Sequence, residues 1–313
     1  MERWFRLYNQ NRRNVWVAIL VIIFVLLIIR TLNVIYRDAK NQDNTIVKNN
    51  TENEVSYKNQ SESLVSGGSV SEAHQEQFGK LIDNFLTYCK NHEPEKAYGL
   101  LSEDCKNILY PNETIFEQQY YKNKFTSEKK YSFQSWTSKD TYIYRVKIFN
   151  NMLATGTGNS EKYIQDYISI VKENDSYKLN VNGFVGKVQR NKEASKKGVT
   201  IKVNNSEIYM DYEIINITVK NSTENTILLD SRKNSNSIYE IDANNNEFEA
   251  ITYENSEDDF IVEPGEEKQI KIKFSNPYRE QMTAIKYVFS DIYMDTNNVQ
   301  YGSNNVEITV DLY

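Results

Sequence analysis

The spacing of the apolar residues changes once along this chain, and that change limits the folds open to it. Six apolar residues between Phe78 and Cys89 fall at i, i+3, i+4, i+7, i+8 and i+11, which is the single stripe of an amphipathic helix. Beyond residue 129, apolar and polar residues alternate instead, in short runs separated by turn residues, as in half-buried strands. We therefore expect a few helices packed on antiparallel strands, followed by strands alone.

Local signals place the helices between residues 71 and 121. Pro94 suits the first turn of a second helix, and Ser102 is a candidate N-cap for a third. Thr114 with Glu117 forms a capping box for a fourth helix. Strand-like runs such as "KYSFQSWTS" and "TYIYRVKIF" come next. The whole stretch 71–186 is thus predicted to be one α+β domain.

Several segments of this domain carry a family pattern. They are the amphipathic first helix, "EKAYGLLSEDCK" (95–106), "YPNETIFEQQYY" (110–121) and the closing hairpin "QDYISIVKENDSYKLNVNGF" (165–184). Together they resemble the nuclear transport factor two-like superfamily, although they include no diagnostic catalytic motif. The resemblance implies a cone-shaped domain, in which a curved antiparallel sheet wraps helices around a pocket.

The C-terminal stretch 199–313 contains only strand and turn signals. Its count of about seven strands and their regular spacing predict an Ig-like β-sandwich domain. No Cys or Trp occurs in it, so it lacks the Cys…Trp…Cys pattern of antibody domains. The segment "VEPGEEKQIKIKF" (262–274) resembles the Ig-like domains appended to bacterial surface proteins.

A basic segment, "GKVQRNKEASKKG" (186–198), separates the two predicted domains. It contains few apolar residues, so we expect residues 187–198 to be a solvated linker. A docking site for an anionic partner is the alternative.

The N-terminal part indicates a membrane anchor. Residues 15–29 carry no charge and the apolar character continues to Tyr36, so 15–36 has about the 20 residues of a transmembrane helix. A cleaved signal peptide is the alternative, but "RTLNVIYRD" after the apolar run is a poor cleavage site. Four Arg residues precede the span, which favours a cytoplasmic tail at 1–14 and extracellular domains. The polar stretch 37–70 is expected to be a flexible linker.

The charge distribution argues against nucleic-acid binding. The net charge is −6, although residues 1–40 carry seven Lys and Arg residues against two acidic ones. The remainder is therefore more acidic than the whole chain. Because nonspecific binding to nucleic acids needs a basic surface, no nucleic-acid partner is predicted.

One acidic residue, Asp166, interrupts the apolar run "YIQDYISIV" (163–171). If its side of the strand lines a pocket, Asp166 is a candidate general base with a raised pKa. Tyr120, Trp136 and Tyr144 are the candidate partners in that pocket, and no His is well placed. We favour the other interpretation, in which Asp166 is a structural, hydrogen-bonded residue.

The remaining candidate groups are few. Cys89 and Cys105 are the only cysteines, and either a disulfide or two buried thiols would suit them. His74 and His92 lack metal-ligand spacing, and no metal or cofactor is predicted. "DANNNEFE" (242–249) begins like a calcium loop but lacks its Gly and final Glu, so a hairpin turn is expected.

No segment carries a convincing catalytic constellation. We therefore expect a non-enzymatic, single-pass cell-membrane protein whose extracellular domains bind a protein or cell-envelope partner. One N-terminal span followed by a cone domain also resembles scaffold subunits of conjugative type IV secretion systems. The alternative is an enzyme or small-ligand binder that uses the pocket of the cone domain. The sequence leaves the partner and the oligomeric state open.

Overall fold

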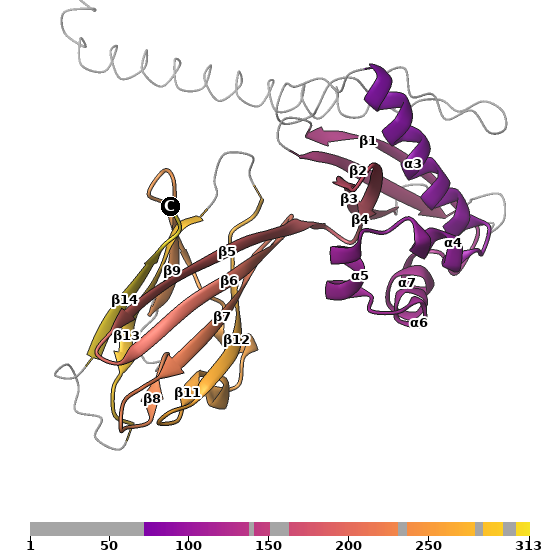
Figure 1. Ribbon diagram of the computed structural model, residues 1–313. Coiled ribbons are helices and arrows are strands. Elements are labelled where there is room, and N and C mark those ends of the chain that lie inside the picture. The colour runs from indigo at the N-terminus through magenta and orange to yellow at the C-terminus, as the bar shows by residue number, and fades with distance from the viewer. Residues whose placement is uncertain (1–71, 138–140, 151–162, 231–236, 279–283, 297–304) are drawn as a thin grey trace, which may run out of the picture. The chain divides into compact units, whose positions relative to one another are not determined.

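The structure is a computed structural model that describes residues 72–137, 141–150, 163–230, 237–278, 284–296 and 305–313 (Figure 1). The chain divides into two compact units, Met1–Val55 and Ser56–Tyr313, and every described residue belongs to the second. The tail, span and linker expected at 1–14, 15–36 and 37–70 lie outside the described residues. No helix of the described part has the length and apolar character needed to cross a membrane.

The helices come first in the described chain, as the apolar spacing predicts. They are α3 (Glu72–Lys90), α4 (Pro94–Gly99), α5 (Glu103–Leu109), α6 (Glu113–Phe116), the π-helical turn η2 (Glu117–Tyr121) and α7 (Lys122–Lys124). Pro94 and Ser102 have the predicted starting positions, and the Ser102 side chain accepts a hydrogen bond from the backbone N–H of Cys105. The predicted capping box is wrong, because Asn112 caps α6 and Thr114 lies inside it.

The first sheet follows these helices and is antiparallel in the order β1-β2-β3-β4. Its strands are β1 (Lys129–Thr137), β2 (Tyr142–Asn150), β3 (Tyr163–Glu173) and β4 (Ser176–Asn180). The helices pack on one face of it: the Phe78 ring of α3 lies 4.7 Å from the ring of Tyr142 and 4.8 Å from that of Tyr177. Helices followed by an antiparallel sheet is the predicted order.

The rest of the chain forms two further sheets (Figure 1). One has the order β12-β7-β6-β5 and contains β5 (Phe184–Lys196), β6 (Val199–Tyr209), β7 (Glu213–Asn221) and β12 (Glu267–Phe274). The other has the order β10-β9-β13-β8-β11, with β14 paired to β13. Its strands are β8 (Ile227–Leu228), β9 (Ile238–Asp242), β10 (Glu247–Glu249), β11 (Ile261–Val262), β13 (Ala284–Tyr293) and β14 (Asn305–Asp311). The short 3₁₀ helices η3 (Thr252–Glu254) and η4 (Glu257–Phe260) precede β11.

These two sheets share one apolar core. Alternate residues of β6 and β7 point inward, as do residues of β13 and β14, so the strands contribute one face each. The buried positions include Ile201, Val203, Ile215, Ile217, Phe289, Ile308 and Val310. The strand state predicted for 199–313 is therefore confirmed, and the structure adds which side of each strand is buried.

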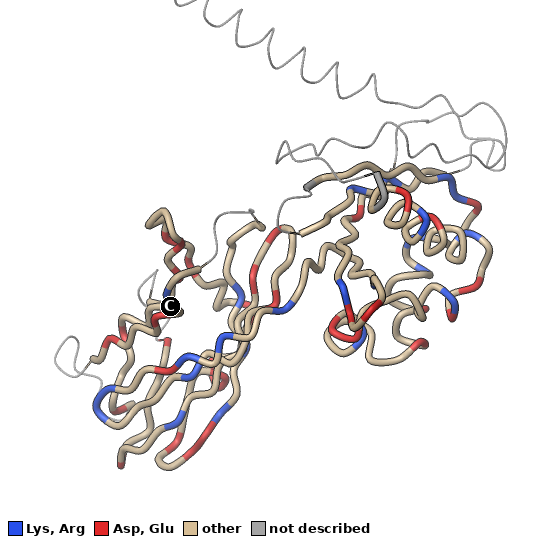
Figure 2. The backbone as a smooth tube through the Cα atoms, turned by 45° about the horizontal axis from the view of Figure 1, so that its top comes forward, with Lys and Arg blue, Asp and Glu red and all other residues tan. Residues whose placement is uncertain are grey.

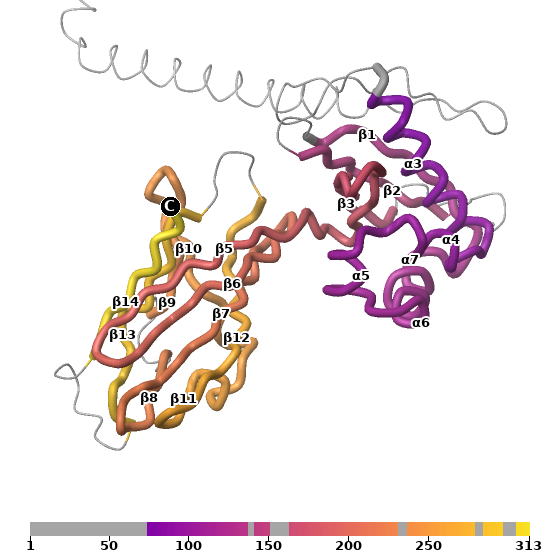
Figure 3. Tube along the Cα trace, viewed as in Figure 1, coloured from indigo at the N-terminus to yellow at the C-terminus, as the bar shows by residue number. Residues whose placement is uncertain are grey.

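The basic linker predicted at 187–198 is wrong, because these residues form most of β5 and its turn into β6 (Figure 3). β5 pairs antiparallel with β6 from Phe184 to Lys196. The chain reverses at Lys197 and Gly198, whose φ angles of 50° and 85° suit a tight hairpin. β5 ends the order of its sheet, and many of its side chains are exposed. An exposed strand at the end of a sheet needs few apolar residues. Its composition is therefore that of a linker, which explains the wrong prediction.

Candidate functional site

Asp166 is the fourth residue of β3 and lies directly opposite Val146 of β2. Its side chain points to the helix-covered face of the first sheet and only 4% of the residue is exposed. An ionised carboxylate in such a place is unfavourable unless other groups neutralise it and supply hydrogen bonds.

The surrounding groups supply both. The Tyr120 hydroxyl donates a 2.7 Å hydrogen bond to Asp166 Oδ2, and Lys124 Nζ lies 2.9 Å from the same oxygen. Asp166 Oδ1 accepts from the backbone N–H of Tyr167 at 2.8 Å, and a longer contact of 3.4 Å joins the Asn182 N–H to Oδ2. Both oxygens therefore have partners, and the negative charge has a lysine beside it.

Lys124 is the member of this site that the sequence analysis missed. Lys124 follows Tyr120 by four residues, a spacing at which side chains share one face of a helix. This spacing could have identified Lys124 as a neighbour of Tyr120. Its Nζ also lies 4.5 Å from the centre of the Tyr120 ring and donates to Asn182 Oδ1. Only 12% of the Lys124 side chain is exposed. The π-helical turn η2 and α7 together bring both groups onto the sheet.

The chemistry of this arrangement is that of a structural tie. Burial, together with the neighbouring Asp166 charge, raises the pKa of Tyr120 well above its usual range. Tyr120 therefore stays protonated and acts as a donor. Three of the four contacts converge on Oδ2 and one reaches Oδ1, so both oxygens of Asp166 are engaged with donors that belong to the protein. The arrangement fixes η2 and α7 against β3.

The structure separates the other two candidate pocket residues. Tyr144 lies on the Asp166 side of the sheet, where its hydroxyl is buried without a hydrogen-bond partner among the described residues. Trp136 lies on the opposite side, where its ring packs 5.4 Å from Tyr167 and 5.5 Å from the guanidinium of Arg145. Of the predicted set, only Tyr120 contacts the Asp166 carboxylate directly.

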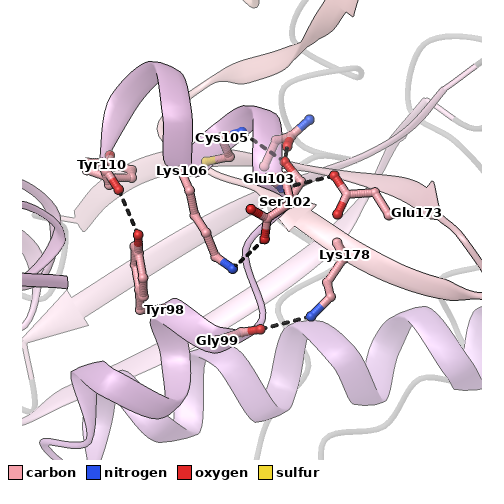
Figure 4. Close-up of polar contacts among 10 residues, drawn as sticks. Tyr98, Gly99, Ser102, Glu103, Cys105, Lys106, Tyr110, Glu173 and Lys178 are labelled. Atoms are coloured by element: carbon pink, nitrogen blue, oxygen red, sulfur yellow. Dashed lines mark hydrogen bonds and ion pairs between the residues drawn. The ribbon is translucent and has the colours of Figure 1, made fainter. Parts of the chain in front are cut away.

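A second group of polar contacts ties α4 and α5 to β3 and β4 (Figure 4). Lys178 Nζ donates to the carbonyl of Gly99 at 2.9 Å, and the Glu103 N–H donates to Glu173 Oε1 at 2.9 Å. The Ser102 hydroxyl, besides capping α5, bonds to the side chain of Asn180. Each of these hydrogen bonds joins the helical segment to the first sheet. These polar contacts therefore also stabilise the packing of the helices on the sheet.

The cysteine and histidine side chains contact other residues of the protein and serve its packing. Cys89 and Cys105 are free, buried thiols, so the structure contains no disulfide between them. Burial raises the pKa of the Cys105 thiol to about 12 and raises that of Cys89 further, which suits inert core residues. The His92 ring bonds to the Tyr121 hydroxyl, and His74 stacks on Phe78 at 5.1 Å.

The calcium-like segment is a hairpin turn between β9 and β10, as predicted. The carboxylate of Asp242 accepts hydrogen bonds from the backbone N–H groups of Asn244 and Asn246 and from the Asn246 side chain. Its oxygens are thus used within the loop, in the manner of an Asx turn.

A buried polar cluster links the two C-terminal sheets, and the sequence analysis missed it. The Tyr287 hydroxyl of β13 donates to Glu213 Oε1 of β7 at 2.6 Å and lies 3.0 Å from the hydroxyl of Ser206. Arg190 Nε of β5 donates to the same serine, and its Nη2 lies 3.9 Å from Glu213. Beside them the fully buried Glu240 accepts from Asn276 at 2.5 Å.

Two groups of this cluster have strongly raised pKa values, the Tyr287 hydroxyl and the Glu240 carboxyl. Burial and the nearby Glu213 raise the pKa of Glu240 to about 9, against the smaller opposing effects of Asn276 and Arg190; Asp242 adds to the rise. The folded protein therefore holds a proton that the unfolded chain releases near pH 4.5. This contribution to stability is complete below that pH and is lost as the pH rises toward 9.

We expect Asp166→Asn to lower the free energy of unfolding by about 2–3 kcal/mol, because it leaves the buried Lys124 ammonium without its counter-charge. Urea denaturation followed by circular dichroism measures the change. Asp175→Asn is the matched control, since Asp175 is exposed in the turn between β3 and β4 and should leave stability unchanged. Equal stabilities for both variants would contradict the structural role of Asp166.

We expect Glu240→Gln to flatten the pH dependence of stability between pH 6 and pH 9. Gln cannot ionise and still accepts from Asn276, so the loss of about 1 kcal/mol per pH unit from this group should vanish. Urea denaturation at several pH values measures the slope. Glu247→Gln, at an exposed position in the same hairpin, serves as the control and should keep the wild-type slope. A Gln variant with the wild-type slope would refute the protonated state.

Comparison with known proteins gives no match: no protein family, no curated protein and no solved structure matches the chain at a significant level.

Proposed function

We propose that this chain is a membrane-anchored bacterial protein that works outside the cytoplasm by binding an envelope partner, without catalysing a reaction. In this proposal residues 15–36 span the membrane once, and residues 37–70 carry the folded part away from it. The folded part serves as a scaffold in a surface assembly, of the kind found in secretion or conjugation systems.

We further propose the finer fold assignments: a cone domain of the nuclear transport factor two-like type and an Ig-like sandwich. The packing of α3 on one face of the first sheet supports the former. The single core shared by two antiparallel sheets supports the latter. β5 would join the two, because its first residue, Phe184, already pairs with β6 and its carbonyl accepts from Ser169 of β3.

The observation that carries the non-enzymatic proposal is the environment of Asp166. Catalytic carboxylates need a free lone pair and a substrate proton within hydrogen-bond reach. Asp166 instead accepts from Tyr120 and pairs with Lys124. Glu213 is also buried and accepts from Tyr287, and Oε1 of the buried Glu240 accepts from Asn276.

The alternative, a small-ligand site in the helix–sheet core, has one observation in its favour. The buried Tyr144 hydroxyl has no partner among the described residues, and a bound molecule with an acceptor group would satisfy it. A compound that raises the melting temperature of the wild type but not of Tyr144→Phe would support this alternative.

The proposal predicts the cellular location of the full chain and the class of protein or envelope component that crosslinks to it. Expressed in bacteria with a C-terminal tag, it should remain in the membrane after carbonate extraction, and protease added to spheroplasts should remove the tag. Crosslinking in intact cells should recover envelope components equally with wild type and Asp166→Asn, at a temperature at which both are folded. Extraction of the chain by carbonate, or loss of the adducts with Asp166→Asn alone, would overturn the proposal.

A further inference from the structure

The face of the first sheet that points away from the helices carries rings and cations. Asp166 and Phe133 point toward the helices, so their neighbours along the strands point the other way. The strand register aligns these neighbours in three cross-strand rows. We call them the outer face: Lys130, Phe149 and Tyr163; Ser132, Lys147 and Gln165; Gln134, Arg145 and Tyr167.

Aromatic rings and cations lie beside one another on the outer face. The rings of Phe149 and Tyr163 lie 5.6 Å apart, and Lys147 Nζ lies 4.6 Å from the centre of the Tyr163 ring. Arg145 lies over Trp136, and Trp136 and Tyr167 pack against the buried residues Val185 and Met210, so the protein itself covers this end of the face. Tyr163 is 43% exposed, so its ring is open to a partner.

The cations of this face have no carboxylate partner on their own strands. The described strands β1–β3 contain two acidic residues, Asp166 and Glu173. Asp166 lies on the helix-covered side with Lys124, and Glu173 accepts from the Glu103 N–H. In the C-terminal strands, by contrast, acidic and basic positions are interspersed (Figure 2).

Acidic residues border the outer face at two places. Asp211 directly follows Met210, and Tyr167 packs against the apolar cluster that contains Met210, so Asp211 lies near the Tyr167 end. Glu128 directly precedes β1. The middle row, with Lys147 between Ser132 and Gln165, carries a positive charge flanked by neutral hydrogen-bonding groups.

We propose that the outer face binds an anionic polysaccharide of the cell envelope, which deepens the proposed function by naming the class of its partner. The exposed ring of Tyr163 offers apolar surface to the flat face of a sugar ring. Arg145 and Lys147, spaced about 7 Å apart along β2, match repeated carboxylate or phosphate groups on a polymer. Ser132, Gln134 and Gln165 supply hydrogen bonds to hydroxyl groups.

Two other occupants fit the face less well. A second copy of the chain would bring Arg145 and Lys147 against the same cations, and like charges at close range oppose association. A nucleic acid needs an extended basic surface for nonspecific binding, and this face offers only Lys130, Arg145 and Lys147.

The test uses the full chain in detergent and measures binding to polygalacturonate, with neutral dextran and a single-stranded oligothymidylate as comparison ligands. We expect binding to polygalacturonate that weakens with salt, and no binding to dextran. The double variant Arg145→Gln, Lys147→Gln should lose affinity at least tenfold, and Tyr163→Ala about fivefold, with unfolding curves showing that both remain folded.

The matched control is Lys187→Gln, Lys192→Gln, which makes the same change of charge on half-buried side chains of β5. It should bind as the wild type does. Four results would overturn the proposal: undiminished binding by the Arg145, Lys147 variant; equal loss in the control; tighter binding to oligothymidylate; or a dimer that the Arg145, Lys147 variant dissociates. The membrane location and crosslinking of the full chain can hold in any of these cases, so the two proposals fail separately.

Discussion

A carboxylate inside an apolar core needs a counter-charge and hydrogen-bond donors close to it. Asp166 is such a carboxylate, and the helix–sheet part of this protein must supply these groups. Lys124 and Tyr120 supply them from a short π-helical turn and the helix after it. The contacts of Asp166 with Lys124 and Tyr120 hold η2 and α7 in place on β3. These short helical segments would not be stable alone. A residue with the type and burial of a catalytic base thus serves to hold the fold.

The two C-terminal sheets also contain a buried carboxylate that is held by a tyrosine hydroxyl and a nearby cation. Tyr287 and Glu213 bond across the space between the sheets, and Arg190 lies beside them. Buried charges that are engaged with each other leave little chemistry for a substrate. The groups that face outward, above all Arg145, Lys147 and Tyr163 on the first sheet, are therefore where recognition is expected.

Apolar spacing alone predicts the order of helices and strands, because burial of one face dictates period 3.6 or period 2. It fails for β5, whose backbone pairs with β6 while charged side chains such as Lys192 and Glu193 give it the composition of a linker. The sequence names Tyr120 as one of three candidate neighbours of Asp166, and it misses Lys124. A lysine ordinarily indicates an exposed position, and only the packing of a helix against a distant strand reveals its burial.

The coupling between Asp166 and Lys124 is the most direct measure of whether this carboxylate is a structural group. A double-mutant cycle with Asp166→Asn, Lys124→Met and the pair combined, followed by urea denaturation, gives that coupling. If the charges neutralise each other in the core, the combined variant should be more stable than the sum of the single losses predicts, by about 1–3 kcal/mol. Strict additivity would contradict this role and return Asp166 to consideration as a catalytic residue.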